Sequence, residues 1–175
     1  MIRHERFYLE HMRIADIPAV CNLFKSDSTK MLFDNFGSDM DEIQVANIYA
    51  NKLNSVDNNS ILFLVYLKKS CRLIGYTSVT NIDYLNRCAE ISIMIDEKYQ
   101  YVGYGPLVSA EVINYCFEEL NMIKVYSKTR VDNPWDPSPV GGQLIRKVPA
   151  GNGRYHDYYH REIFKTEWVN VRSKG

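Results

Sequence analysis

The chain has 175 residues, a usual length for one domain, and 46% of them are hydrophobic, which is enough for a substantial core. Lysine plus arginine and aspartate plus glutamate each number 21, so the formal net charge is zero. Because proteins that bind nucleic acid usually carry a basic excess, this balance argues against nucleic acid as the main partner. We expect a single domain over residues 1–175.

The four cysteines indicate a reducing compartment. Cys21, Cys71, Cys88 and Cys116 form no CxxC pair and match no zinc spacing, so we expect reduced thiols in a cytoplasmic protein and no metal site. The N-terminal residues have no apolar signal core, and no apolar run approaches the length that crosses a membrane. We therefore expect neither secretion nor a membrane partner.

The N-terminal part predicts one strand followed by two helices. Apolar and polar residues alternate over residues 6–12, which is typical of a strand. Residues 15–24 predict a helix, with Asp16 as its cap and Pro18 in its first turn. Residues 39–56 predict a second helix, whose first turn is acidic, as the helix dipole favours.

The middle of the chain predicts strands interrupted by one helix. Residues 60–67 and 71–82 are rich in β-branched and aromatic residues on either side of a short turn, and predict an antiparallel hairpin. A third strand over residues 88–95 is followed by a helix from about Pro106 to Leu120 and by a strand over residues 123–131. This order predicts two adjacent parallel strands joined by a right-handed crossover.

The C-terminal part differs in composition. Residues 132–142 hold three prolines and two glycines, so they cannot form the interior of a helix. Residues 143–168 predict two strands around a Gly-Asn-Gly turn. The chain therefore predicts an α+β fold whose sheet is antiparallel at its start and contains one central parallel pair.

A Gly-Tyr-Gly turn lies between the third strand and the helix. Gly103 and Gly105 allow positive φ and a close approach to the backbone, and Pro106 suits the first position of a helix. The free N–H groups at such a helix start attract an anion. The dinucleotide fingerprint GxGxxG is not met because position 108 is valine, and no Walker Gly-Lys-Ser/Thr occurs. A tight turn with no ligand and an anion site of another kind both remain open.

With its surroundings, this turn resembles motif A of the GNAT N-acetyltransferases. Gln100, Gly103 and Gly105 fit the pattern Gln/Arg-x-x-Gly-x-Gly/Ala, after a strand and before a helix. Residues 72–95 and 119–133 resemble the strands on either side of motif A. The C-terminal residues 152–168 resemble the branch that holds ribosomal-protein N-terminal and spermidine acetyltransferases. Nearly the full chain is covered.

The resemblance implies the GNAT acyl-CoA N-acyltransferase fold, a mixed central sheet flanked by helices, with acetyl-CoA as cosubstrate. The pyrophosphate would lie on backbone N–H groups of the turn, and the pantetheine arm would pair with the third strand like an added strand. Asn133 matches the asparagine that usually ends the next strand. The coenzyme-binding residues implied are Ile93, Met94, Ile95, Gln100, Tyr101, Val102, Gly103, Tyr104, Gly105 and Asn133.

For the chemistry, Glu90 matches a place where similar family members carry a basic carboxylate, although it is also typical of an ordinary strand-end charge. His156 and His160 share one face of a tail strand and could supply a base, or be the polar tips of an edge strand. The family's helix with an acidic tyrosine is replaced here by a proline-rich segment after Asn133. Tyr126, a tail tyrosine or solvent would then protonate the leaving thiolate.

Two further features bear on the ligands. Trp135, in the proline-rich segment, could cover the coenzyme or pack on the surface. Acidic residues lie where this family tends to build its acceptor groove, and would suit a cationic amine, or be ordinary helix-capping charges. These residues are Asp34, Asp39, Asp41 and Glu42.

We therefore expect an N-acetyltransferase that transfers acetyl from acetyl-CoA to a primary amine by direct attack in a ternary complex. The amine would be a polyamine, an amino sugar or a protein N-terminus, and a homodimer is possible. The altered segment after Asn133 supports an alternative, a catalytically weak CoA-binding or regulatory module.

Overall fold

The computed structural model describes residues 1–23, 42–55, 59–133, 142–149 and 155–172. In this part of the chain eight strands form one sheet in the order β1-β2-β3-β4-β5-β6-β8-β7. The strands are β1 (Ile2–Arg3), β2 (Phe7–His11), β3 (Ile61–Leu67), β4 (Leu73–Asp83), β5 (Cys88–Ile95), β6 (Lys124–Arg130), β7 (Gln143–Pro149) and β8 (Tyr155–Phe164). The helices are η1 (Ile14–Asp16), α1 (Ile17–Leu23), α3 (Glu42–Asn54), η2 (Glu97–Tyr99), α4 (Tyr104–Glu118) and α5 (Lys165–Arg172).

The predicted mixed sheet and its central parallel pair are confirmed. β5 and β6 are parallel, and the described pairings of the other neighbouring strands are antiparallel. Helix α4 connects β5 to β6, which is the predicted strand–helix–strand unit. The hairpin of β3 and β4 is also confirmed, with Ile61 opposite Val79 and Val65 opposite Gly75.

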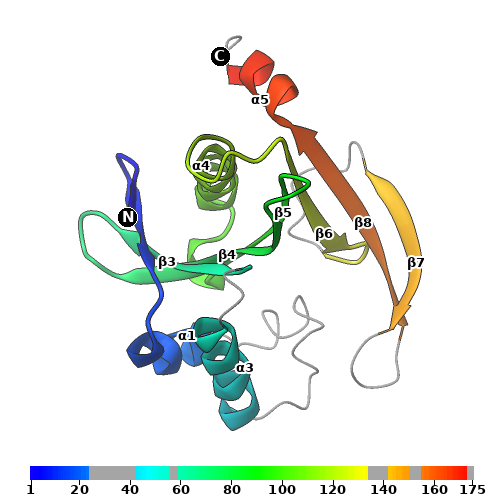
Figure 1. Cartoon of the computed structure of the whole chain (residues 1–175). Helices are drawn as coiled ribbons and strands as arrows, with labels where there is room; N and C mark the ends of the chain where they lie inside the picture. The colour runs from blue at the N-terminus through cyan, green and yellow to red at the C-terminus, as the bar shows by residue number, and fades with distance from the viewer. Residues whose placement is uncertain (24–41, 56–58, 134–141, 150–154, 173–175) are drawn as a thin grey trace.

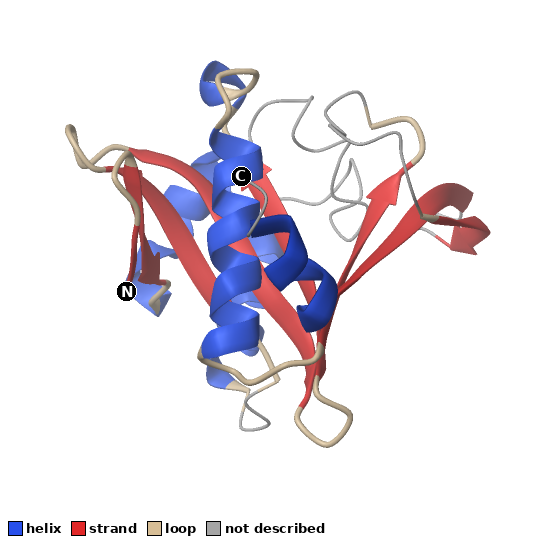
Figure 2. Cartoon of the chain, turned by 90° about the horizontal axis from the view of Figure 1, so that it is seen from above, coloured by secondary structure: helices blue, strands red, loops and turns tan. Residues whose placement is uncertain are grey.

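Helices cover both faces of the sheet. Helix α4 lies on one face, and α1 and α3 lie on the other (Figures 1 and 2). Because side chains alternate along a strand, one strand can contribute side chains to the cores on both faces of the sheet. On β5, Ile91 and Ile95 pack in the core on the α4 side, while Met94 packs in the core with Val45 and Tyr49 of α3. Even-numbered residues of β5, including Glu90, therefore face α3.

Some predicted boundaries were wrong. The central helix starts at Tyr104 and ends at Glu118, so Pro106 is its third residue rather than its first. This position is tolerated because a first-turn N–H has no partner within the helix. At the N-terminus Asp16 does not cap α1. It lies in η1, and its carboxylate accepts a hydrogen bond from the Arg13 N–H at 2.8 Å.

The two predicted C-terminal strands are confirmed as the antiparallel pair β7 and β8, but the end of the second was wrong, because β8 ends at Phe164 and helix α5 follows. The Glu167 carboxylate accepts a hydrogen bond from the Phe164 N–H at 3.0 Å, which is half of a capping box. Trp168 donates its indole N–H to Asn114 of α4 at 2.7 Å, and Lys165 donates to the Phe117 carbonyl at 2.8 Å. These contacts hold α5 against α4. Figure 1 shows α5 at the top of the view, directly after the end of β8. The predicted Gly-Asn-Gly turn lies outside the described residues.

Among the described residues, no helix has both the length and the apolar character that crossing a membrane requires. All four cysteines are free thiols, with Cys21 and Cys116 buried and Cys71 exposed.

Candidate active site

The two parallel strands at the centre of the sheet separate after a short paired segment. β5 and β6 pair at Cys88 with Lys124, Ala89 with Val125, and Glu90 with Tyr126. Beyond these positions β5 continues to pair with β4, and β6 with β8, but the described residues contain no further pairing between β5 and β6. We call this region, residues 91–95 of β5 and 127–130 of β6, the β5–β6 splay.

The backbone of β5 presents hydrogen-bonding groups to the splay. The Asp96 N–H donates to the Ile74 carbonyl at 2.8 Å, so even-numbered residues here direct their backbone groups to β4. By the same alternation, Ile91 and Ile93 direct theirs toward the splay. The Ile95 carbonyl accepts a hydrogen bond from the Gln100 side chain at 2.7 Å. An added extended ligand could thus pair with the backbone of Ile91 or Ile93, whereas the backbone groups of Met94 bond to β4.

The turn after β5, residues 100–105, forms an open helix start. Tyr101 has φ 59° and Gly103 has φ 87°, and Gly103 is the N-cap of α4. Beyond its chain neighbours and its own helix backbone, a Cβ built on Gly103 or Gly105 would meet no atom of the described residues within 4 Å, so the described part of the chain leaves the surface above both glycines free. Tyr101 and Val102 are exposed. The N–H groups of the first turn of α4, with the helix dipole behind them, can therefore receive an anion.

Two arginines from distant parts of the chain support this turn. Arg6, in the turn before β2, donates to the Val102 carbonyl at 3.3 Å, and its guanidinium lies 4.5 Å from the centre of the Tyr104 ring. Arg72, in the turn before β4, donates to the Tyr99 hydroxyl at 3.1 Å. Sequence reasoning missed both, because nothing local connects residues as far apart as Arg6 and Val102.

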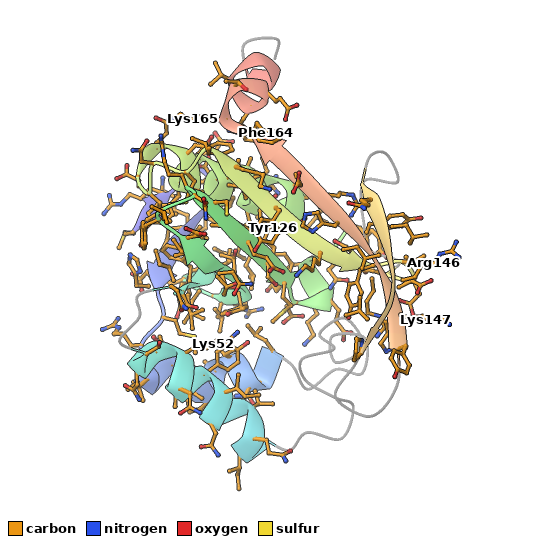
Figure 3. The ribbon with its side chains drawn as sticks, turned by 45° about the vertical axis from the view of Figure 1, so that its right-hand side comes forward. Lys52, Tyr126, Arg146, Lys147, Phe164 and Lys165 are labelled. Carbon is orange, nitrogen blue, oxygen red and sulfur yellow. The ribbon has the colours of Figure 1, made fainter. Side chains whose placement is uncertain are left out.

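Glu90 lies at the closed end of the splay, on the face covered by α3. Its carboxylate accepts a hydrogen bond from Asn81 at 2.9 Å and lies 3.6 Å from the Lys128 ammonium. The side chain is 18% exposed. Burial lowers the pKa of Lys52 on α3, while the charge of Glu90 acts to raise it. Figure 3 shows Lys52 on α3, below the part of the sheet that carries Tyr126. Glu90 is thus a half-buried carboxylate between two lysines.

Tyr126 is the register partner of Glu90 on β6. Burial raises the pKa of Tyr126, the charge of Glu90 raises it further, and a hydrogen bond with Asn81 acts in the opposite direction. The phenol therefore keeps its proton to a higher pH than an exposed tyrosine. The ring also lies 5.2 Å, between centres, from the imidazole of His160. Sequence reasoning named Glu90 and Tyr126 separately, and the structure brings them together.

The two tail histidines lie at different distances from this pair. On β8, Glu162 is opposite Tyr126 and His160 is opposite Lys128, so His160 borders the site. Glu162 lies 3.0 Å from His160 Nε2 and 2.9 Å from the Lys124 ammonium. His156 is six residues before Glu162, roughly 20 Å along an extended strand. His156 instead contributes to lowering the pKa of Asp132, whose main partner is Arg130.

Asn133 lies at the end of β6, where its N–H donates to the Arg130 carbonyl at 3.1 Å. Because β5 and β6 are parallel, this end of β6 is on the same side of the sheet as residues 100–105. The segment that follows, with Trp135, lies outside the described residues, as do Asp34, Asp39 and Asp41 and the side chain of Glu42.

The match to a known family identifies the class of protein to which the chain belongs. Residues 6–135 match the family described as Acetyltransferase (GNAT) domain. The chain therefore belongs to the GNAT acetyltransferase family, which confirms the resemblance seen in the sequence.

Two curated relatives are similar over part of their length. The spermidine N(1)-acetyltransferase of Vibrio cholerae is 30% identical over 105 residues, which cover 56% of this chain and 60% of the relative. A Bacillus subtilis protein, provisionally named ribosomal N-acetyltransferase YdaF, is 31% identical over 102 residues, covering 55% and 56% respectively. The chain thus spans less than two thirds of the curated relatives that it matches.

Solved structures show the same fold over nearly the whole chain. The spermidine N-acetyltransferase from Vibrio cholerae in complex with CoA and spermine superimposes with a TM-score of 0.76 at 22% identity, covering 95% of this chain and 100% of that one. A chimera of the Vibrio cholerae enzyme and hSSAT gives a TM-score of 0.78 at 23% identity.

Proposed function

We propose that this protein is an acetyl-CoA-dependent N-acetyltransferase that acts on a primary amine. One observation carries the proposal: the Glu90–Tyr126 pair closes a splay whose other end faces the open start of α4. A ligand with an anionic end and an extended, amide-bearing arm fits this arrangement, and acetyl-CoA is such a ligand. Membership in the GNAT family supports the same conclusion.

We assign the coenzyme-binding residues from the shape of the splay and of the turn over residues 100–105. The pyrophosphate would rest on the N–H groups of residues 101–105, among which Gly103 leaves the surface open. The pantetheine arm would pair with the backbone of Ile93 as an added strand. Arg6 would hold the turn in its binding shape through Val102 and Tyr104. This arrangement would direct the thioester toward the closed end of the splay, at Glu90.

The chemistry requires a base for the amine and an acid for the leaving thiolate. Glu90, held by Asn81, would accept the proton that the acceptor ammonium loses, so that the neutral amine can attack the thioester. Tyr126, whose raised pKa keeps its phenol protonated, would serve as the acid and replace the family's tyrosine from the segment after Asn133. His160, in contact with Tyr126, is better placed than His156 to exchange protons with this pair.

The acceptor would be a polyamine, an amino sugar or a protein N-terminus. Two relatives, by their names, act on spermidine and on a ribosomal component, so both small and protein amines belong in a test panel.

We also propose a cytoplasmic location and a homo-oligomer. One Vibrio cholerae structure is described as dodecameric, and light scattering after gel filtration would measure the assembly of this chain.

A catalytically weak CoA-binding module remains the second candidate, favoured by the proline-rich segment that replaces the family's tyrosine-bearing helix. Calorimetric titration with acetyl-CoA, followed by a thiol-release assay over the amine panel, separates the two. Binding with turnover on at least one amine supports the enzyme. Binding without turnover on any amine supports the module, and no binding would exclude both.

A further inference from the structure

A lysine of the protein itself lies beside the two residues to which we assign proton transfer. The Lys128 ammonium lies 3.6 Å from Glu90 Oε2 and 5.9 Å from the centre of the Tyr126 ring. It therefore contacts both residues to which we assign proton transfer. With 45% of its side chain exposed, Lys128 also has room to change its rotamer.

The position of Lys128 on β6 places it beside the splay. The last pairing between β5 and β6 is at Tyr126, two residues before Lys128, so Lys128 belongs to the unpaired edge of β6. Side chains two apart on a strand point to the same face, so Lys128 shares with Tyr126 the face covered by α3. Lys52 also approaches Glu90, but from α3, across the space between helix and sheet.

We propose that Lys128 is a self-acetylation site, with acetyl-CoA as the donor. The inference rests on the proposed function, because it requires the thioester to lie in the splay. The neutral Nζ attacks the thioester carbonyl, so the amide C–N bond forms and the C–S bond breaks. Glu90 takes the proton of the ammonium and passes it to water. The attack releases the second proton, and the thiolate takes up one, so that the products are acetyl-lysine, the free thiol of the coenzyme and one proton.

A tethered amine has a kinetic advantage over free lysines. Groups held in reactive orientation reach very high effective concentrations, so we expect acetylation of Lys128 to exceed that of an exposed lysine by at least about tenfold. The product also changes the site. Acetylation removes the charge of Lys128 and with it the ion pair to Glu90, which leaves that carboxylate available to the ammonium of an external acceptor.

The test uses the full chain incubated with acetyl-CoA alone, digested with trypsin and analysed by quantitative mass spectrometry. Trypsin cleaves after Lys124, Lys128 and Arg130, so acetylation of Lys128 leaves the peptide of residues 125–130 uncut. Lys69, exposed in the turn between β3 and β4, reports the uncatalysed background in the same sample. Gly103→Val, which should weaken coenzyme binding at least tenfold, and Lys128→Arg are the matched variants, with acetyl-CoA held below the concentration that would saturate Gly103→Val.

The expected result is selective acetylation of Lys128 at a rate independent of protein concentration, falling to the Lys69 rate in Gly103→Val. Equal rates at Lys128 and Lys69, a rate that rises with protein concentration, or selective acetylation of Lys52 instead would each overturn the assignment. If any of these accompanies thiol release with an external amine, the proposed function stands and only the Lys128 inference fails. If titration shows no acetyl-CoA binding, both fail.

Discussion

Glu90 and Tyr126 are direct register partners at the last paired position of two parallel strands, immediately before those strands separate. Their side chains share one face of the sheet, and the charge of Glu90 raises the pKa of Tyr126. A carboxylate and a protonated phenol are therefore held next to each other at the closed end of the splay.

Replacing Gly103 by valine should weaken acetyl-CoA binding at least tenfold. A branched side chain would occupy the free surface above the turn, and φ 87° is strained for any residue with a Cβ. Gly103→Ala is the matched control, since it adds the strain with little bulk. Titration calorimetry should show an affinity that falls from glycine to alanine to valine. An unchanged affinity in both variants would show that this turn does not bind the pyrophosphate.

Glu90→Gln should lower kcat by roughly a hundredfold or more, because a glutamine cannot accept the proton of the amine. The amide can still accept a hydrogen bond from Asn81, so the fold should be unaffected. Loss of the charge should also lower the pKa of Lys52 further, because Glu90 now acts to raise it. The measurement is the pH–rate profile of thiol release. An unaltered profile and turnover would show that Glu90 is not the base.

Tyr126→Phe should reduce kcat by about ten- to a hundredfold with little change in coenzyme affinity. Since burial and the charge of Glu90 raise the pKa of Tyr126, its phenol stays protonated at and below the usual tyrosine pKa. The wild-type rate should therefore not fall from ionisation of Tyr126 up to about pH 10. Phenylalanine keeps the ring contact with His160, so thermal stability should change little. Full activity in this variant would assign the acid to solvent or to another tyrosine.

Arg6→Ala should weaken coenzyme binding by about two- to fivefold, in line with the modest strength of an exposed cation–π contact. Arg6 would act by holding residues 100–105 through Val102 and Tyr104. Arg3→Ala, an equal loss of charge on the neighbouring strand β1, is the control and should leave the affinity unchanged. Equal losses in both variants would indicate a general charge effect, which added salt would suppress.

The thiols should react in the order of their exposure. Burial raises the pKa of Cys116 to about 12, so at pH 8 almost none of it is thiolate. Cys71 is exposed in the turn between β3 and β4 and should be alkylated first. Timed labelling with iodoacetamide and mass spectrometry would check this, and rapid labelling of Cys116 in the folded protein would contradict its burial between α4 and the sheet.

Local patterns identified what lies close together in the sequence. The motif Gln100, Gly103 and Gly105 was readable because its strand, turn and helix are consecutive, and the crossover fixes β5 and β6 as parallel neighbours. The same reading missed α5. A strand-like alternation ran past Phe164, and the capping signal from Glu167 to the Phe164 N–H was overlooked.

The sequence by itself therefore determined the fold class, the family and the turn that would receive the coenzyme, since these rest on local motifs and on the order of the elements along the chain. Only the tertiary structure decided which side chains meet. The register of β5 and β6 sets Glu90 beside Tyr126 and brings Lys128 to the same carboxylate. The pairing of β8 with β6 places His160, rather than His156, next to Tyr126. A one-residue slip would reverse the face of every side chain on a strand, and that register is fixed by core packing over the whole sheet rather than by any local motif.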